Sequence, residues 1–204
     1  MTVSLALVDY IPVVLFLISA IILQRDFYNK MSKGAFALFA AGSLMIFFAG
    51  FYKATWKLLF CAGLCDFEKL SQTFMPMQST GYLLIAVSLL AMFFFPQGKG
   101  AAFSVAAPAV FSGTFLFIPM MCAGIGVLCA ALSVLAAKLK KKGLIFLFVL
   151  SFVAMLAMGY LASQDFADPK MNWIAEGVNV LGQGTLLLGA CRLHKAGLAE
   201  LRLS

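Results

Sequence analysis

Residues 101–137, AAFSVAAPAVFSGTFLFIPMMCAGIGVLCAALSVLAA, decide the fold because they contain no charged residue. As one helix, this stretch would be about 56 Å long at about 1.5 Å per residue. The hydrocarbon core of a bilayer is only about 30 Å thick. The stretch is therefore either one overlong helix or two membrane helices joined by a tight turn. Residues 112–114 (SGT), with Pro108 before them and Pro119 after them, provide a break, so we expect two helices.

The composition of the whole chain also requires a membrane. The 204 residues are 63% hydrophobic and 11% charged, whereas soluble domains average about 25% charged residues. A mean hydropathy of +1.02 cannot be hidden in one water-soluble core of this size, since small domains keep much of their surface exposed. We expect an all-α, polytopic transmembrane helical bundle that forms a single domain over residues 1–204 and lies in the cell membrane.

Seven spans are predicted, at about residues 5–23, 34–58, 79–95, 101–115, 118–137, 143–162 and 172–191. Six spans are the alternative, in which residues 101–137 cross the bilayer once. The first apolar segment lacks a basic region before it and a clear cleavage site after it, so we interpret it as a retained helix.

The distribution of basic residues favours seven spans with the N-terminus outside and the C-terminus in the cytoplasm. In that arrangement most of the 15 basic residues face the cytoplasm, as the positive-inside rule requires. They are Arg25, Lys30, Lys33, Lys99, Lys138, Lys140, Lys141, Lys142, Arg192, Lys195 and Arg202. With six spans, residues 25–33 and 138–142 would face opposite sides and the bias would largely vanish. The net charge of +7 is thus explained by membrane topology, and we expect no nucleic-acid partner.

Little in the sequence indicates catalysis, metal binding or a cofactor. Cys61 and Cys65 are four residues apart, a spacing that suits a disulfide poorly within a helix. The five cysteines do not form a metal-type CxxC pair, and hydrolase, zinc-protease and nucleotide-binding signatures are absent. His194, the one histidine, lies among basic residues at the end of the last span. We therefore expect no catalytic residue, no metal and no cofactor. Enzymatic activity is not favoured, and a membrane enzyme that acts on lipid is left as a third alternative.

The last span carries the best candidates for a binding site. Glu176, Asn179 and Gln183 have spacings of three and four, which place them on one face of a helix. Ionisable groups inside a membrane are expensive and are functional candidates by default. Trp173 lies at the outer end of this span, where aromatic residues favour the interface.

Two further charged residues are predicted at a similar depth. Asp9 lies about one turn inside the first span, and Lys53 lies toward the outer end of the second. An outward-facing pocket with Glu176 and Asp9 as anionic groups and Lys53 as counter-ion is the resulting hypothesis. The alternatives are that the carboxylates stay hydrated at the interface, and that Lys53 and Lys57 extend outward to it. The amides of Asn179 and Gln183 would then only join helices.

Small residues predict which helix faces pack. The last span contains Gly177, Gly182, Gly184 and Gly189, and small residues permit close helix approach in lipid. The span at 118–137 has small residues in register as well. They are Cys122, Gly126, Ala130, Ser133 and Ala137.

These patterns favour a transport protein, or the substrate-binding membrane subunit of one, for a small organic solute. The alternative is a ligand-sensing or scaffolding membrane protein that signals through a cytoplasmic partner bound at residues 138–142. The bilayer and a small-molecule ligand are the expected partners, and a protein partner or a second copy of the chain is left open.

Overall fold

The computed structural model describes residues 3–95, 114–161 and 169–202, and these residues form helices without a strand. Five long apolar stretches qualify by length and composition as membrane spans: Val3–Phe27, Lys33–Cys61, Lys69–Phe94, Leu116–Lys138 and Gly143–Leu161. The predicted all-helical membrane bundle is therefore confirmed. The predicted span at 101–115 lies outside the described residues except for Thr114 and Phe115, which begin a helix.

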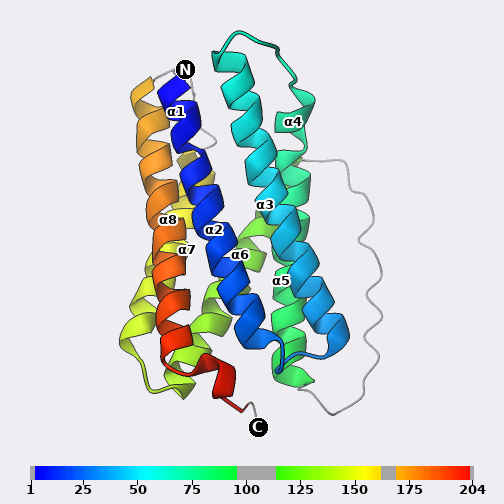
Figure 1. Ribbon diagram of the computed structural model, residues 1–204, viewed down its shortest axis with the longest axis vertical. Helices are drawn as coiled ribbons and strands as arrows, with labels where there is room; N and C mark the ends of the chain where they lie inside the picture. Colours follow the sequence, from blue (N-terminus) through cyan, green and yellow to red (C-terminus); the bar gives the residue numbers. More distant parts are fainter. Residues whose placement is uncertain (1–2, 96–113, 162–168, 203–204) are drawn as a thin grey trace.

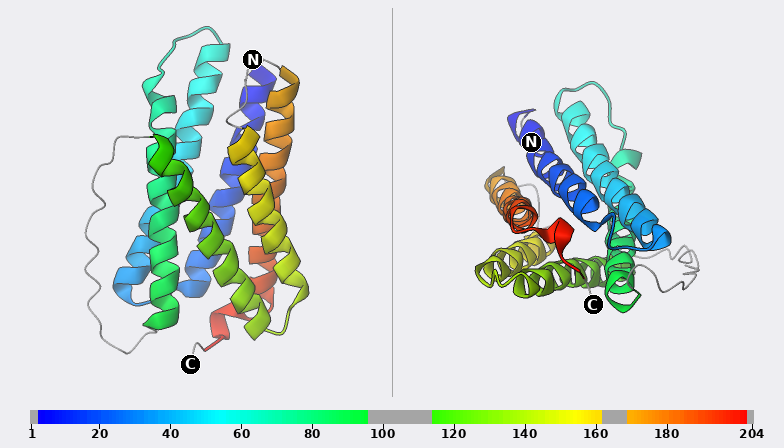
Figure 2. Two further views of the ribbon diagram at one scale, coloured as in Figure 1. Left: turned by 180° about the vertical axis from the view of Figure 1, so that it is seen from behind. Right: turned by 60° about the horizontal axis from the view of Figure 1, so that its bottom comes forward.

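The long helices lie side by side and follow one another around the bundle in chain order (Figures 1 and 2). Their bounds are α1 Val3–Val8, α2 Tyr10–Phe27, α3 Lys33–Cys61, α4 Lys69–Gln72, α5 Phe74–Phe94, α6 Thr114–Lys138, α7 Gly143–Leu161 and α8 Pro169–Lys195, followed by the short 3-10 helix η1 Leu198–Glu200. At about 1.5 Å per residue, α3 is about 44 Å long, so it extends beyond a bilayer core of about 30 Å.

The direction of the helices is informative. α2, α5, α6 and α8 run toward the end of the bundle that carries the C-terminus, and α3 and α7 run back (Figures 1 and 2). The consecutive helices α5 and α6 are thus parallel, and the two chain termini lie at opposite ends. Below, we call the end with the N-terminus the upper end and the end with the C-terminus the lower end, as they stand in Figure 1.

Local sequence explains where the helices begin and bend. The Ser32 hydroxyl accepts a hydrogen bond of 3.3 Å from the Ala35 amide and caps α3. Pro119 does not separate two helices, because α6 already begins at Thr114 and continues through it. A proline is tolerated there at the loss of one backbone hydrogen bond.

Helix packing leaves an apolar stripe toward the membrane. On α2 the side chains of Ile11, Val14, Ile18 and Ile21 are 41–56% exposed and recur at helical spacing. The opposite side of α2 is buried, with Phe27 packed edge-to-face on Phe39 of α3 at a ring-centroid distance of 5.4 Å. This exposed stripe of large apolar side chains suits a lipid environment, since a soluble protein rarely exposes a large apolar patch.

Candidate functional site

Asp9 lies at a break between α1 and α2, close to the upper end of the bundle. Pro12, one turn later, has no amide to donate to the Val8 carbonyl, and its ring crowds that position. The helix is consequently interrupted at Asp9, although the chain keeps helical dihedral angles there (φ −57°, ψ −22°). The Asp9 side chain is buried, with 6% exposure.

Asp9 forms an ion cluster with residues from two other helices. The Lys57 ammonium, on α3, contacts Asp9 Oδ2 and also lies 3.3 Å from Glu176 Oε1, on α8. The side chains of all three residues are at most 10% exposed. We call Asp9, Lys57 and Glu176 the charge cluster. It joins α2, α3 and α8, which are far apart in the sequence.

The electrostatics of the charge cluster are unbalanced. Two carboxyl groups share one ammonium and also interact with each other, and Asp9 Oδ1 and Glu176 Oε2 are buried without a donor from any other described residue. A buried acceptor that has no partner costs about 1–3 kcal/mol, and more if it is charged. Because two neighbouring carboxylates repel each other, the cluster is suited to bind a proton.

Lys53, the predicted counter-ion, does not contact either carboxylate. Its ammonium instead lies 4.1 Å from the centroid of the Phe74 ring on α5, a cation–π arrangement. Lys57, one turn further along α3, takes the counter-ion position. Both lysines lie near the C-terminal end of α3. The sequence alone does not indicate which of them contacts the carboxylates.

The remaining predicted site residues are distributed along α8. Gln183 is buried near the Tyr82 hydroxyl of α5, with which its side chain interacts, and its Oε1 atom has no hydrogen-bond partner. Asn179 is half-buried. Trp173 is 47% exposed. The structure thus brings Glu176 and Asp9 together through Lys57 and leaves Trp173 outside this site.

A second polar contact closes the lower end of the bundle. His194 Nδ1 lies 2.7 Å from Oδ1 of the fully buried Asp26. Lys30, in the loop after α2, donates hydrogen bonds to the Ala199 carbonyl at 2.9 Å and to the Leu201 carbonyl at 2.6 Å. Burial lowers the pKa of Lys30, and the Asp26 carboxylate partly offsets this effect. These contacts hold the C-terminal segment against the α2–α3 loop, so we interpret them as structural.

Cysteine and metal chemistry find no support in the described part of the chain. The five cysteines are free thiols, Cys61 and Cys65 included. Among residues 3–95, 114–161 and 169–202, no three histidine, cysteine or acidic side chains are grouped as metal ligands. Comparison of the chain with protein-family models, curated proteins and solved structures gives no match.

Proposed function

We propose that this protein is a membrane carrier for a small organic solute and that the charge cluster is its binding and coupling site. The observation that supports this proposal is the burial of Asp9, Lys57 and Glu176 in mutual contact between three helices. Ionisable groups at such positions are costly and mark substrate or ion pathways in membrane proteins.

A purely structural role explains the cluster less well. A buried ion pair is often replaceable by apolar residues at no cost in stability, and here two neighbouring carboxyl groups also compete for one ammonium. A solute that carries an amine would donate to Asp9 Oδ1 and Glu176 Oε2 and balance the charge. The low exposure of the three side chains then corresponds to a closed conformation of a site that opens toward the upper end.

The same proposal includes seven crossings of the cell membrane, with the N-terminus outside. Support comes from the described helices on either side of residues 96–113, since α5 and α6 run in the same direction (Figure 2). Six described helical segments are long enough to cross a membrane, and the seventh crossing, between α5 and α6, is part of the proposal. Residues 138–142, at the lower end, then face the cytoplasm, and the charge cluster lies near the outer surface.

Topology can be tested with a native cysteine. Cys65 is exposed in the loop between α3 and α4, at the upper end of the bundle. In a variant in which Cys65 is the only cysteine, we expect a membrane-impermeant maleimide to label intact cells. A cysteine introduced by Lys140→Cys in a background without other cysteines should be labelled only after the membrane is opened. Labelling of both sites from outside would contradict the proposed topology.

Transport can be tested with purified protein in proteoliposomes. We expect uptake of radiolabelled methylammonium or ethylammonium above protein-free liposomes, and we expect Glu176→Gln to reduce it at least tenfold (about 1.4 kcal/mol). Glutamine keeps the size and an acceptor for Lys57, and the remaining Asp9–Lys57 pair is neutral overall. The variant should therefore fold as well as the parent while losing uptake.

The matched control is Glu200→Gln, which removes an exposed carboxylate at the lower end of the bundle. It should leave uptake unchanged. Neutral glycerol, tested in parallel, should not be taken up faster than by protein-free liposomes. Binding of the cationic probes without uptake would refute transport and would favour the sensing alternative.

A further inference from the structure

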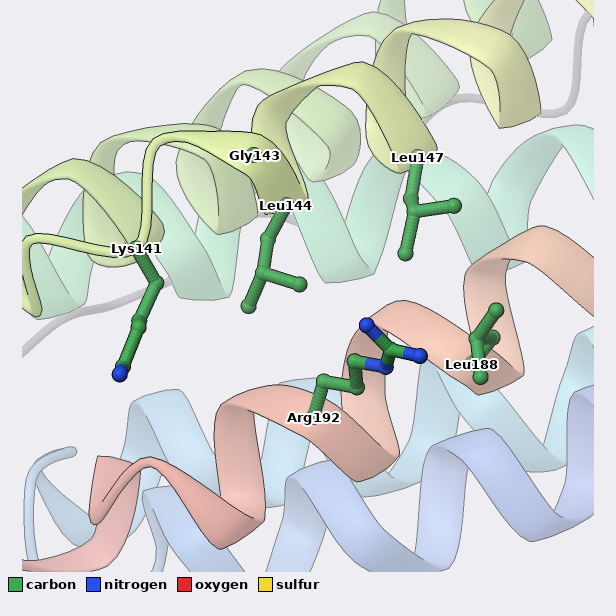
Figure 3. Close-up of a pocket in the computed structure, with 6 residues that line it drawn as sticks. All are labelled: Lys141, Gly143, Leu144, Leu147, Leu188 and Arg192. Atoms are coloured by element: carbon green, nitrogen blue, oxygen red, sulfur yellow. The ribbon is translucent and has the colours of Figure 1, made fainter.

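A groove opens between α7 and α8 near the lower end of the bundle, away from the charge cluster (Figure 3). It has a volume of about 350 Å³ and is lined by Lys141, Gly143, Leu144, Leu147, Leu188 and Arg192. Volumes of about 300–1,000 Å³ are usual for small-molecule sites. The leucines extend from both helices toward the groove (Figure 3). Lys141 lies at the end of the groove nearest the turn between α6 and α7, and the Arg192 guanidinium points into the groove between Leu147 and Leu188.

The packing of α7 on α8 explains why the groove starts where it does. Above it the helices touch closely, because the Ser151 hydroxyl donates to the Gly182 carbonyl at 2.8 Å. A side chain at Gly189 would collide with the Phe148 ring, which shows how close the two helices still are there. Closer to the lower end, at Leu144 and Arg192, this close contact gives way to open space.

The turn between α6 and α7 brings a cation to the groove. Lys140 adopts a left-handed conformation (φ 58°), and the Lys141 amide donates to the Ala136 carbonyl at 2.9 Å, which ends α6. Among the described residues, neither Lys141 nor Arg192 forms a salt bridge. The groove also lies at the N-terminal end of α7, where the helix dipole favours an anion.

We propose that this groove binds one anionic phospholipid, with the phosphate between Lys141 and Arg192 and an acyl chain along Leu144, Leu147 and Leu188. The proposal follows because the groove combines basic side chains, which suit a phosphate, with leucine side chains, which suit an acyl chain. Lys141 lies near the end of the membrane-spanning helices, where lipid headgroups are found, and the Arg192 guanidinium lies beside the leucine side chains of both helices, which form the apolar wall of the groove. Basic pockets between membrane helices bind lipid headgroups by this arrangement.

The leucine wall distinguishes a phospholipid from free phosphate. A soluble anion would need only Lys141 and Arg192 and would gain nothing from Leu147 or Leu188. The open side of the groove excludes a tightly enclosed soluble ligand as well, since Leu188 is 44% exposed. An acyl chain satisfies both observations because it is continuous with the surrounding bilayer.

The test is native mass spectrometry of the delipidated protein, titrated with phosphatidylglycerol or with phosphatidylcholine of the same acyl chains. We expect a saturable adduct with phosphatidylglycerol at lower concentration than with phosphatidylcholine. Each basic residue near an anionic lipid contributes about fivefold in affinity, so Lys141→Gln with Arg192→Gln should weaken phosphatidylglycerol binding about 25-fold. The matched control is Lys138→Gln with Lys140→Gln, which removes the same number of positive charges next to the groove, near the turn between α6 and α7. It should weaken phosphatidylglycerol binding less than threefold.

A second pair of variants tests the apolar half of the site. Leu147→Trp fills the groove and should reduce phosphatidylglycerol binding at least fivefold, whereas Val149→Trp, at an exposed position of the same helix, should not. Soluble glycerophosphate at millimolar concentration should not displace the lipid. Equal losses of phosphatidylglycerol binding in the two double variants, or equal binding of both lipids, would overturn the proposal and indicate general attraction to the bilayer surface. Displacement by glycerophosphate would overturn it in favour of a free phosphate ligand.

Discussion

Replacement of Lys57 by methionine is expected to lower the free energy of unfolding by about 3–5 kcal/mol and to abolish uptake. The substitution removes the ammonium that both Asp9 and Glu176 contact. Methionine has about the same length and packs well in apolar surroundings, so the loss is one of charge rather than of volume. The measurement is unfolding of the detergent-solubilised protein, followed by the fluorescence of its two tryptophans.

The size of this effect follows from what remains after the substitution. Two carboxylates would be buried side by side, with no cation in contact and with both unpartnered oxygens still out of water. Removing one partner of a buried ion pair is far more destructive than removing the whole pair, since an uncompensated charge is left behind. The triple variant Asp9→Asn, Lys57→Met, Glu176→Gln should therefore regain most of the stability, although not the uptake.

Lys53→Met is the matched control, because it makes the same substitution one turn earlier on α3. Its ammonium lies over the Phe74 ring, and such contacts contribute about 0.5–2 kcal/mol, with the larger values at sites removed from water. We expect a loss of stability of about 2 kcal/mol or less. Equal losses for the two lysine variants would show that the charge cluster does not hold the helices as the contacts indicate.

The membrane bundle was predictable from the sequence because the physical requirement is simple. Charge-free stretches such as residues 114–137 exceed what any soluble core of this size can hide, and helices satisfy their own backbone hydrogen bonds in lipid. The last helix, α8, is long enough to cross a membrane but is less apolar than the other long helices. It is not among the five stretches that qualify on apolar character, because the same polar residues that identify it as a site lower its hydropathy.

The charge cluster could be predicted only in part. A carboxylate within an apolar helix is visible in the sequence, so Asp9 and Glu176 could be selected. Which lysine pairs with them depends on the rotation of α3 against α2 and α8, and four residues along a helix correspond to about one turn. The partnership of Gln183 with Tyr82 is likewise a matter of tertiary packing, since tyrosine in an apolar span gives no signal of its own.

Small residues were an unreliable guide to packing. On α6 the predicted face includes Ala130 and Ala137, which are exposed, whereas the buried face carries Leu128 and Leu132. On α8, Gly182 and Gly189 meet α7, but an added Cβ at Gly184 would touch nothing. Glycine and alanine permit close approach without requiring it, so a helix face cannot be chosen from their spacing alone.

Gly42→Leu is expected to lower the free energy of unfolding by about 3 kcal/mol, the upper end of the usual cost of overpacking. At Gly42, on α3, a Cβ atom would lie 2.6 Å from the Gly81 carbonyl oxygen and 3.1 Å from the Ile85 amide nitrogen, both on α5. These are backbone atoms, so no side-chain rotation relieves the collision and α3 must move away from α5. The measurement is again tryptophan fluorescence during unfolding in detergent.

The control for this prediction is Gly184→Leu on α8, where no atom lies within 4 Å of an added Cβ. Leucine is a better helix former than glycine by somewhat less than about 1 kcal/mol, so this variant should be as stable as the parent or more stable. The contrast separates close helix contact from helix propensity, because both substitutions replace a glycine in the middle of a long helix. If Gly42→Leu were also harmless, α3 and α5 could not be packed backbone to backbone at Gly42 and Gly81. The position of Lys57 on the same helix, and with it the charge cluster, would then lose its structural basis.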